Sequence, residues 1–116
     1  MNESLRQKKV ARIVKEILSA QLITHFRDSE AGLVTITRLN ISKDLRTAQV
    51  FVSVFDEASQ AAVLERLRSL QNTFRKSVAT RSKLKYNPKL IFSLDPLVNL
   101  ESRIDQLLSG ISKDEH

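Results

Sequence analysis

The chain has 116 residues and a mass of 13.2 kDa, a length that suits one domain with a single hydrophobic core. It contains no cysteine, which excludes disulfides, thiol catalysis and cysteine metal sites and fits a reducing compartment. No apolar run approaches the roughly 18 residues of a membrane span, and a formal net charge of +6 favours a phosphate-rich partner.

The first predicted element is an amphipathic helix over residues 4–25. Ser4 and Gln7 have the spacing of a capping box, and apolar residues recur at helical steps from Val10 onward. Four cations crowd the first two turns, where they oppose the helix dipole and so do not serve helix stability: Arg6, Lys8, Lys9 and Arg12. Two roles stay open for them, as solubility charges or as an extension of a basic binding surface.

Two β-strands are predicted next, over residues 33–42 and 46–55, paired as an antiparallel hairpin. In the first strand the apolar alternation changes phase, which predicts a β-bulge near Arg38. In the second strand one face carries the predicted core residues Ala48, Val50, Val52 and Val54.

The longest predicted helical segment runs from about residue 58 to about residue 85 and contains most of the basic charge. Asn72 is a weak helix former, which predicts a kink at residues 71–73. Asn87 and Pro88 end the segment, residues 89–94 form a third strand, and a last amphipathic helix is expected over residues 97–109. We expect one domain over residues 1–116, with a core at about 4–95 and a frayed tail at 111–116.

Between Glu65 and Asp95 this stretch carries eight cations and no acid. A charge run is often only a solvated helix face, whereas a run without acids also suits contact with an external polyanion. The predicted phosphate-contacting residues are Arg68, Arg75, Lys76, Arg81 and Lys83, with Lys85, Lys89 and the cluster Arg6, Lys8, Lys9 and Arg12 extending the surface. Arg81 lies close to the apolar stripe of an ideal helix, so its alternative role is to bond helix-terminal carbonyls.

Residues for catalysis or cofactor binding do not converge in the sequence. His25 and His116 are the only histidines, the two glycines are isolated, and no pair of residues has metal-ligand spacing. We therefore expect a protein that is not an enzyme and binds no cofactor, metal or small-molecule substrate.

Four ordered segments resemble a known family. One is the hairpin sequence VTITRLNISKDLRTAQVFVSVF, and the others carry Leu67 and Arg75, then Leu84 to Asp95, then Arg103 to Leu108. Together these segments, from about residue 10 to about residue 108, resemble the ribosome-binding factor A family.

The resemblance implies an α+β fold, a type II KH-like domain of order α-β-β-α-kink-α-β with a three-stranded sheet and a C-terminal helix. It implies a monomeric bacterial or organellar factor, cytoplasmic in bacteria, that binds the immature small (30S) ribosomal subunit, assists late processing of 16S rRNA and supports growth in the cold. The family has an Ala-x-Gly kink between its second and third helices, and this chain departs from it with Leu70, Gln71 and Asn72.

Two rival functions remain from the residues themselves. The basic surface could bind an acidic protein partner, or the domain could be a general binder of single-stranded RNA. Aromatic residues are only 5% of the chain, which favours recognition of RNA shape and backbone over reading of bases.

Overall fold

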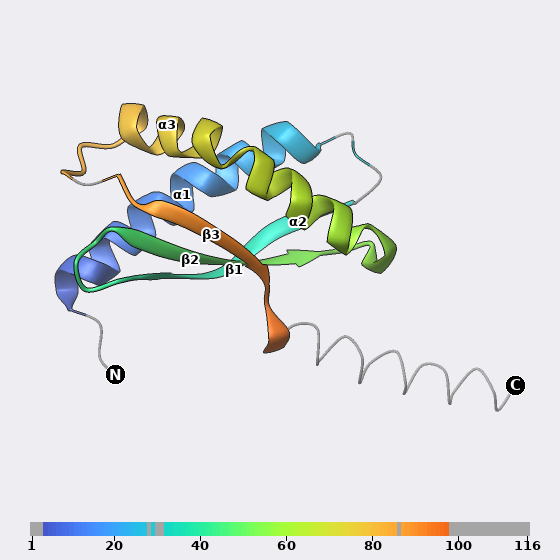
Figure 1. Cartoon of the computed structure of the whole chain (residues 1–116), viewed down its shortest axis with the longest axis horizontal. Helices are drawn as coiled ribbons and strands as arrows, with labels where there is room; N and C mark the ends of the chain where they lie inside the picture. The colour runs from blue at the N-terminus through green and yellow to red at the C-terminus, as the bar shows by residue number, and fades with distance from the viewer. Residues whose placement is uncertain (1–3, 28, 30–31, 86, 98–116) are drawn as a thin grey trace, which may run out of the picture.

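The computed structural model describes residues 4–27, 29, 32–85 and 87–97, and in these ranges three helices cover one face of a three-stranded sheet (Figure 1). In chain order the elements are α1 (Leu5–Phe26), β1 (Val34–Ile41), β2 (Thr47–Val54), the 3-10 turn η1 (Glu57–Ser59), α2 (Gln60–Ser69), α3 (Gln71–Arg81) and β3 (Lys89–Leu94). This is the predicted α+β order, as far as β3.

The sheet has the order β1-β2-β3, with β2 at its centre. β1 and β2 are antiparallel neighbours in the chain, whereas β3 pairs with β2 in parallel after the chain has passed through α2 and α3. A parallel pair needs such a crossover, which is why both helices lie on the same face of the sheet as α1.

The predicted bulge in β1 is confirmed. The register between β1 and β2 shifts between Ile36 and Arg38, so both halves of the strand direct their apolar residues to the core. All four predicted core residues of β2 are buried, and they pack with α1 residues such as Val14 and Leu18 and with Phe74 of α3 in one hydrophobic cluster.

The long helical segment differs from its prediction in three ways. It is interrupted at Leu70, which lies one residue before the range 71–73 predicted from helix propensity but is the first of the three residues matched to the family's kink. Gln71 and Asn72 already belong to α3. It begins with the turn η1, and it ends at Arg81 rather than near residue 85. The C-cap of the helix is Ser82, whose backbone is extended (φ −124°, ψ 164°) while its N–H and its hydroxyl both donate to the carbonyl of Val78, at 3.1 and 2.5 Å. The expected C-terminal helix at 97–109 and the tail at 111–116 lie outside the described residues, except for Leu97.

Candidate nucleic-acid interface

The N-terminal end of α1 is attached to the sheet by one buried glutamine. Gln7 completes the predicted capping box, since its Oε1 accepts from the backbone N–H of Ser4 at 2.9 Å and its own N–H donates to Ser4 Oγ at 3.1 Å. Its Nε2 also donates to the carbonyl of Ile41 at 2.8 Å, at the end of β1. The basic first turns of α1 are therefore held at a defined place beside the hairpin turn.

The hairpin turn itself presents a leucine in an unusual conformation. Leu45 has a φ of 63°, in the left-handed region, yet its side chain is buried. Asp44 stabilises the turn, because its Oδ1 accepts from the hydroxyl of Ser42 at 2.6 Å and from the backbone N–H of Arg46 at 3.1 Å. The hydrogen bond from Ser42, followed by that from Arg46, holds the pKa of Asp44 below its ordinary value of 3.8.

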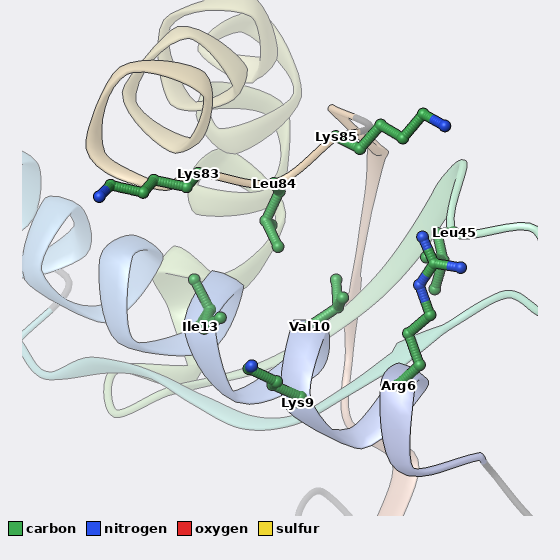
Figure 2. A pocket seen from close by; sticks show the side chains of 8 residues that line it. All are labelled: Arg6, Lys9, Val10, Ile13, Leu45, Lys83, Leu84 and Lys85. Atoms are coloured by element: carbon green, nitrogen blue, oxygen red, sulfur yellow. The ribbon is translucent and has the colours of Figure 1, made fainter.

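The segment after α3 brings two further cations to the same region. Because the helix ends at Arg81, residues 83–85 are not helical, and Lys83 and Lys85 extend in opposite directions on either side of Leu84 (Figure 2). Leu84 is half-buried against the hydrophobic core and points towards Val10 and Ile13 of α1.

The first turns of α1, the hairpin turn and residues 83–85 border an open pocket of about 300 Å³ (Figure 2). Its eight lining residues are four cations and four aliphatic residues, without an acid: Arg6, Lys9, Lys83 and Lys85, and Val10, Ile13, Leu45 and Leu84. In the described part of the chain Arg6, Lys9 and Lys83 make no hydrogen bond or ion pair, so their charges face solvent. We call this site the basic pocket.

The other predicted contact residues lie outside the basic pocket. Five of them have exposed side chains: Lys8 and Arg12 on α1, Lys76 and Arg81 on α3, and Lys89 at the start of β3. Arg81 makes no hydrogen bond to a helix-terminal carbonyl among the described residues, so its charge stays on the surface. These cations can extend the positive field around the basic pocket.

Arg68 and Arg75 donate hydrogen bonds at the outer edge of β3. No strand of the described sheet pairs with this edge. Arg75 donates from Nε to the carbonyl of Pro88 at 3.2 Å and from Nη2 to that of Asn87 at 3.0 Å, and Arg68 donates to the carbonyl of Phe92 at 3.3 Å. Gln71 completes the row, since its Oε1 accepts from the N–H of Leu90 at 3.1 Å. Three side chains of α2 and α3 thus satisfy backbone groups that an edge strand would otherwise expose.

The residues predicted as a kink have different surroundings. Leu70 has φ −91° and ψ 6°, between the helical regions of α2 and α3, and its side chain packs against the core. Gln71 accepts a hydrogen bond from β3, and of the three residues only Asn72 is exposed. The chain therefore bends between α2 and α3 at a residue whose side chain packs against the hydrophobic core.

The outward face of the sheet offers little free aromatic surface at its centre. The guanidinium of Arg38 lies over the ring of Phe51, 4.2 Å from its centroid, and Arg38 Nε is 3.4 Å from Asp95 Oδ2. Thr37 also donates to Asp95, at 2.5 Å. One face of the half-buried Phe51 ring is therefore occupied by Arg38, which favours the basic pocket over this ring as the candidate for RNA contact.

Sequence reasoning did not foresee the pocket or the arginine contacts with β3. Helical periodicity placed Val10 and Ile13 on an apolar stripe, but nothing local indicated that Leu84 and Leu45 would meet them. Arg68 and Arg75 lie on the same flank of the predicted helix, which indicated that they share a contact. The predicted partner in that contact was phosphate.

No metal or membrane chemistry competes with this interpretation in the described ranges. Among those residues no cluster of three or more His, Cys, Asp or Glu side chains is arranged to hold a metal ion. Within the same ranges, no helix combines the length and apolar character needed to span a bilayer.

The sequence matches one protein family over most of its length. The family model described as ribosome-binding factor A matches residues 6–108. Curated proteins named ribosome-binding factor A are similar as well: that of Geobacter metallireducens is 37% identical over 112 residues, covering 95% of this chain and 94% of that protein, and that of Syntrophus aciditrophicus is 35% identical over 116 residues, covering 99% and 94%.

Solved structures with this fold carry the same name. A Thermotoga maritima protein described as a ribosome binding factor A, solved by NMR, aligns with a TM-score of 0.66 and 26% identity over 82% of this chain and 92% of its own. A homology model of the Thermus thermophilus ribosome binding factor A, fitted into the cryo-EM map of a 30S complex of that factor, aligns with a TM-score of 0.59 and 22% identity over 79% of this chain and 93% of its own. At 22% identity the second comparison supports the fold alone.

Proposed function

The chain belongs to the ribosome-binding factor A family, and we propose that it binds the small ribosomal subunit through the phosphates of 16S rRNA and assists late maturation of that rRNA without catalysing a reaction. The name that the family and its curated members carry, ribosome-binding factor A, supports the ribosome as the partner. The protein would act as a monomer where small subunits are assembled, in the bacterial cytoplasm or an organellar matrix.

The observation that carries the proposal is the convergence of two cationic clusters from distant parts of the sequence. Arg6 and Lys9 lie near the start of the chain and Lys83 and Lys85 some 75 residues later, yet they border one pocket without an intervening acid. Cations that serve only solubility have no reason to gather at one site, because like charges repel one another. Their gathering favours a polyanion as the partner.

The proposed mechanism is charge neutralisation and positioning. Phosphate contacts hold a protein in register on RNA but carry little sequence information, so selectivity for the small subunit would come from the shape of the rRNA. If the four cations of the basic pocket each neutralise one phosphate, log K should fall against log salt with a slope of roughly −3.

Co-sedimentation tests the proposal. The purified protein is centrifuged with immature small subunits, mature small subunits and large subunits at a series of salt concentrations. We expect salt-sensitive binding to small subunits, stronger for immature particles. Equal binding to large subunits would contradict the choice of partner, and equal binding to immature and mature small subunits would contradict the maturation role.

The rival partner, an acidic protein, gives a different result in the same assay. Binding to a protein component would survive nuclease digestion of the rRNA, whereas binding to phosphates would be lost with the rRNA. A general binder of single-stranded RNA would in turn retain homopolymer RNA as well as it retains small subunits.

A further inference from the structure

We propose that the basic pocket holds a single unpaired nucleotide of RNA, with its base against the aliphatic floor and its phosphates beside the cations of the rim. The inference rests on the proposed function, because it assumes that the polyanion is RNA. It goes further, since it assigns a base-binding site to a domain whose charges alone predict contacts with phosphate only.

The size of the pocket suits one nucleotide base. A volume of about 300 Å³ is at the lower end of the range for sites that take small molecules, and it equals the liquid volume of about ten water molecules. A purine ring system has a comparable number of non-hydrogen atoms. The pocket is too small for a segment of duplex, whose bases are in any case held inside their stack.

The lining has two chemical parts, and phosphate explains only one of them. Arg6, Lys9 and Lys83 provide charge at the rim, but a phosphate chain gains nothing from an aliphatic floor. Val10 and Ile13 of α1 and Leu84 after α3 form that floor, and a flat base removed from water gains from contact with it.

Ile13 is the most informative residue of the floor. Val10 is a member of the hydrophobic core and Leu84 packs against it, so both have a structural reason to be apolar. Ile13 is only half-buried, and it does not belong to the group of residues that pack on the hydrophobic core. In the described part of the chain it lines the basic pocket. An apolar side chain there is explained by a ligand that covers it.

The base that enters the basic pocket should belong to an unpaired nucleotide. Proteins read RNA bases at loops, bulges and ends, where a base can leave its stack at small cost. No aromatic ring lines the pocket, so the gain should correspond to the lower end of the stacking range, which is about tenfold in affinity.

The experiment compares three short RNA hairpins by fluorescence anisotropy with the full-length protein. One is fully paired, one carries a single bulged adenosine, and one carries the same bulge as an abasic nucleotide, which keeps every phosphate but lacks the base. We expect the bulged hairpin to bind about tenfold more tightly than the paired hairpin, and the abasic hairpin to bind like the paired one.

Ile13→Gln should reduce the preference for the bulged hairpin from about tenfold to about one, whereas Ile13→Val should keep it. Ile23→Ala is the matched control, because Ile23 is an exposed isoleucine of the same helix that does not line the basic pocket. Thermal melting confirms that each variant is folded before binding is measured.

Equal binding of the abasic and bulged hairpins would overturn the inference, because the gain would then come from phosphates or from the bend of the helix. An unchanged preference for the bulged hairpin in Ile13→Gln would also overturn it, since the base would then bind outside the basic pocket. Small-subunit co-sedimentation of the same preparation separates the two proposals: subunit binding without bulge preference rejects this inference alone, and loss of both rejects the proposed function.

Discussion

The two ends of α3 are both basic, but their cations do different work. Before and within the first half of α3, Arg68 of α2 and Arg75 of α3 donate to backbone carbonyls of β3 and of the loop before it. Beyond the C-terminal end, Lys83 joins Arg6 and Lys9 of α1 around the basic pocket, where these cations have no partner among the described residues. From Arg75 to the end of α3 at Arg81 the helix rises by about 9 Å, at 1.5 Å per residue.

The difference shows that the sequence alone does not reveal whether a cationic side chain binds the protein's own backbone or an external ligand. An arginine beside an edge strand can satisfy carbonyls that would otherwise lie unpaired, and its side chain then serves the fold first. A cation that borders a cavity without a protein acceptor keeps its charge for a ligand. The comparison predicts that substitutions at the pocket change binding and that substitutions at the β3 edge change stability.

The largest effect should follow reversal of two charges at the pocket. Lys9→Glu with Lys83→Glu removes two attractions to phosphate and adds two repulsions, each worth about 1 kcal/mol in water, so affinity for small subunits should fall about a thousandfold. Lys15→Glu with Arg27→Glu is the matched control, because it changes the same charge at exposed positions that do not line the pocket. An equal loss in the control would reduce the pocket to part of a general positive field.

Arg75→Ala should act mainly on stability. It removes two hydrogen bonds from a charged donor to the carbonyls of Asn87 and Pro88, which should lower the free energy of unfolding by about 2 kcal/mol in urea titrations. Lys76→Ala, at the exposed neighbouring position, should change it by less than about 0.5 kcal/mol. If Arg75→Ala kept full stability but lost subunit binding, Arg75 would belong to the RNA interface and the division would be wrong.

Gln71→Ala tests the same edge without a change of charge. It leaves the N–H of the buried Leu90 without its acceptor, and the expected cost is about 1 kcal/mol, with faster hydrogen exchange of the Leu90 amide. Asn72→Ala is the control, since Asn72 is exposed in the same turn of α3. Unchanged exchange at Leu90 would mean that the glutamine does not protect the strand.

The smallest effect is expected at the turn that holds Leu45. Because the folded pKa of Asp44 is lowered, its ionised form stabilises the turn above about pH 3.8, and this contribution is lost as the pH falls through the lower folded pKa. Asp44→Asn should therefore reduce the melting temperature slightly at pH 7 and less at pH 3. A difference that grew towards acid would have the opposite sign and would exclude this role.

Much of the fold was accessible from the sequence, and the reasons are local. The capping box of Ser4 and Gln7, the phase change near Arg38 and the apolar face of β2 each depend on neighbours within a few residues. The end of α3 was placed too late because helix propensity does not reveal the extended backbone of Ser82. Helix propensity also placed the interruption at 71–73, one residue after Leu70, whose side chain packs against the core.

The candidate site was only half accessible for the opposite reason. Every cation of the basic pocket was among the predicted contact residues, because composition reveals charge. The division between pocket and β3 edge depends on which residues meet across the fold, and the contacts of Arg75 and the approach of Leu84 to Ile13 join segments whose spacing in the sequence carries no signal.

The basic pocket also has a consequence for when a newly made chain can act. Its lining extends from Arg6 to Lys85, so it includes the first helix and a segment made only after α3. The β1–β2 hairpin can close early from local contacts, whereas β3 pairs with β2 only after the whole α2–α3 crossover has been synthesised. A nascent or truncated chain that lacks the end of α3 would already expose the cations of α1 but would have no pocket. Competence for binding would arrive as one of the last events of folding, so partly folded chains would not occupy assembling ribosomes.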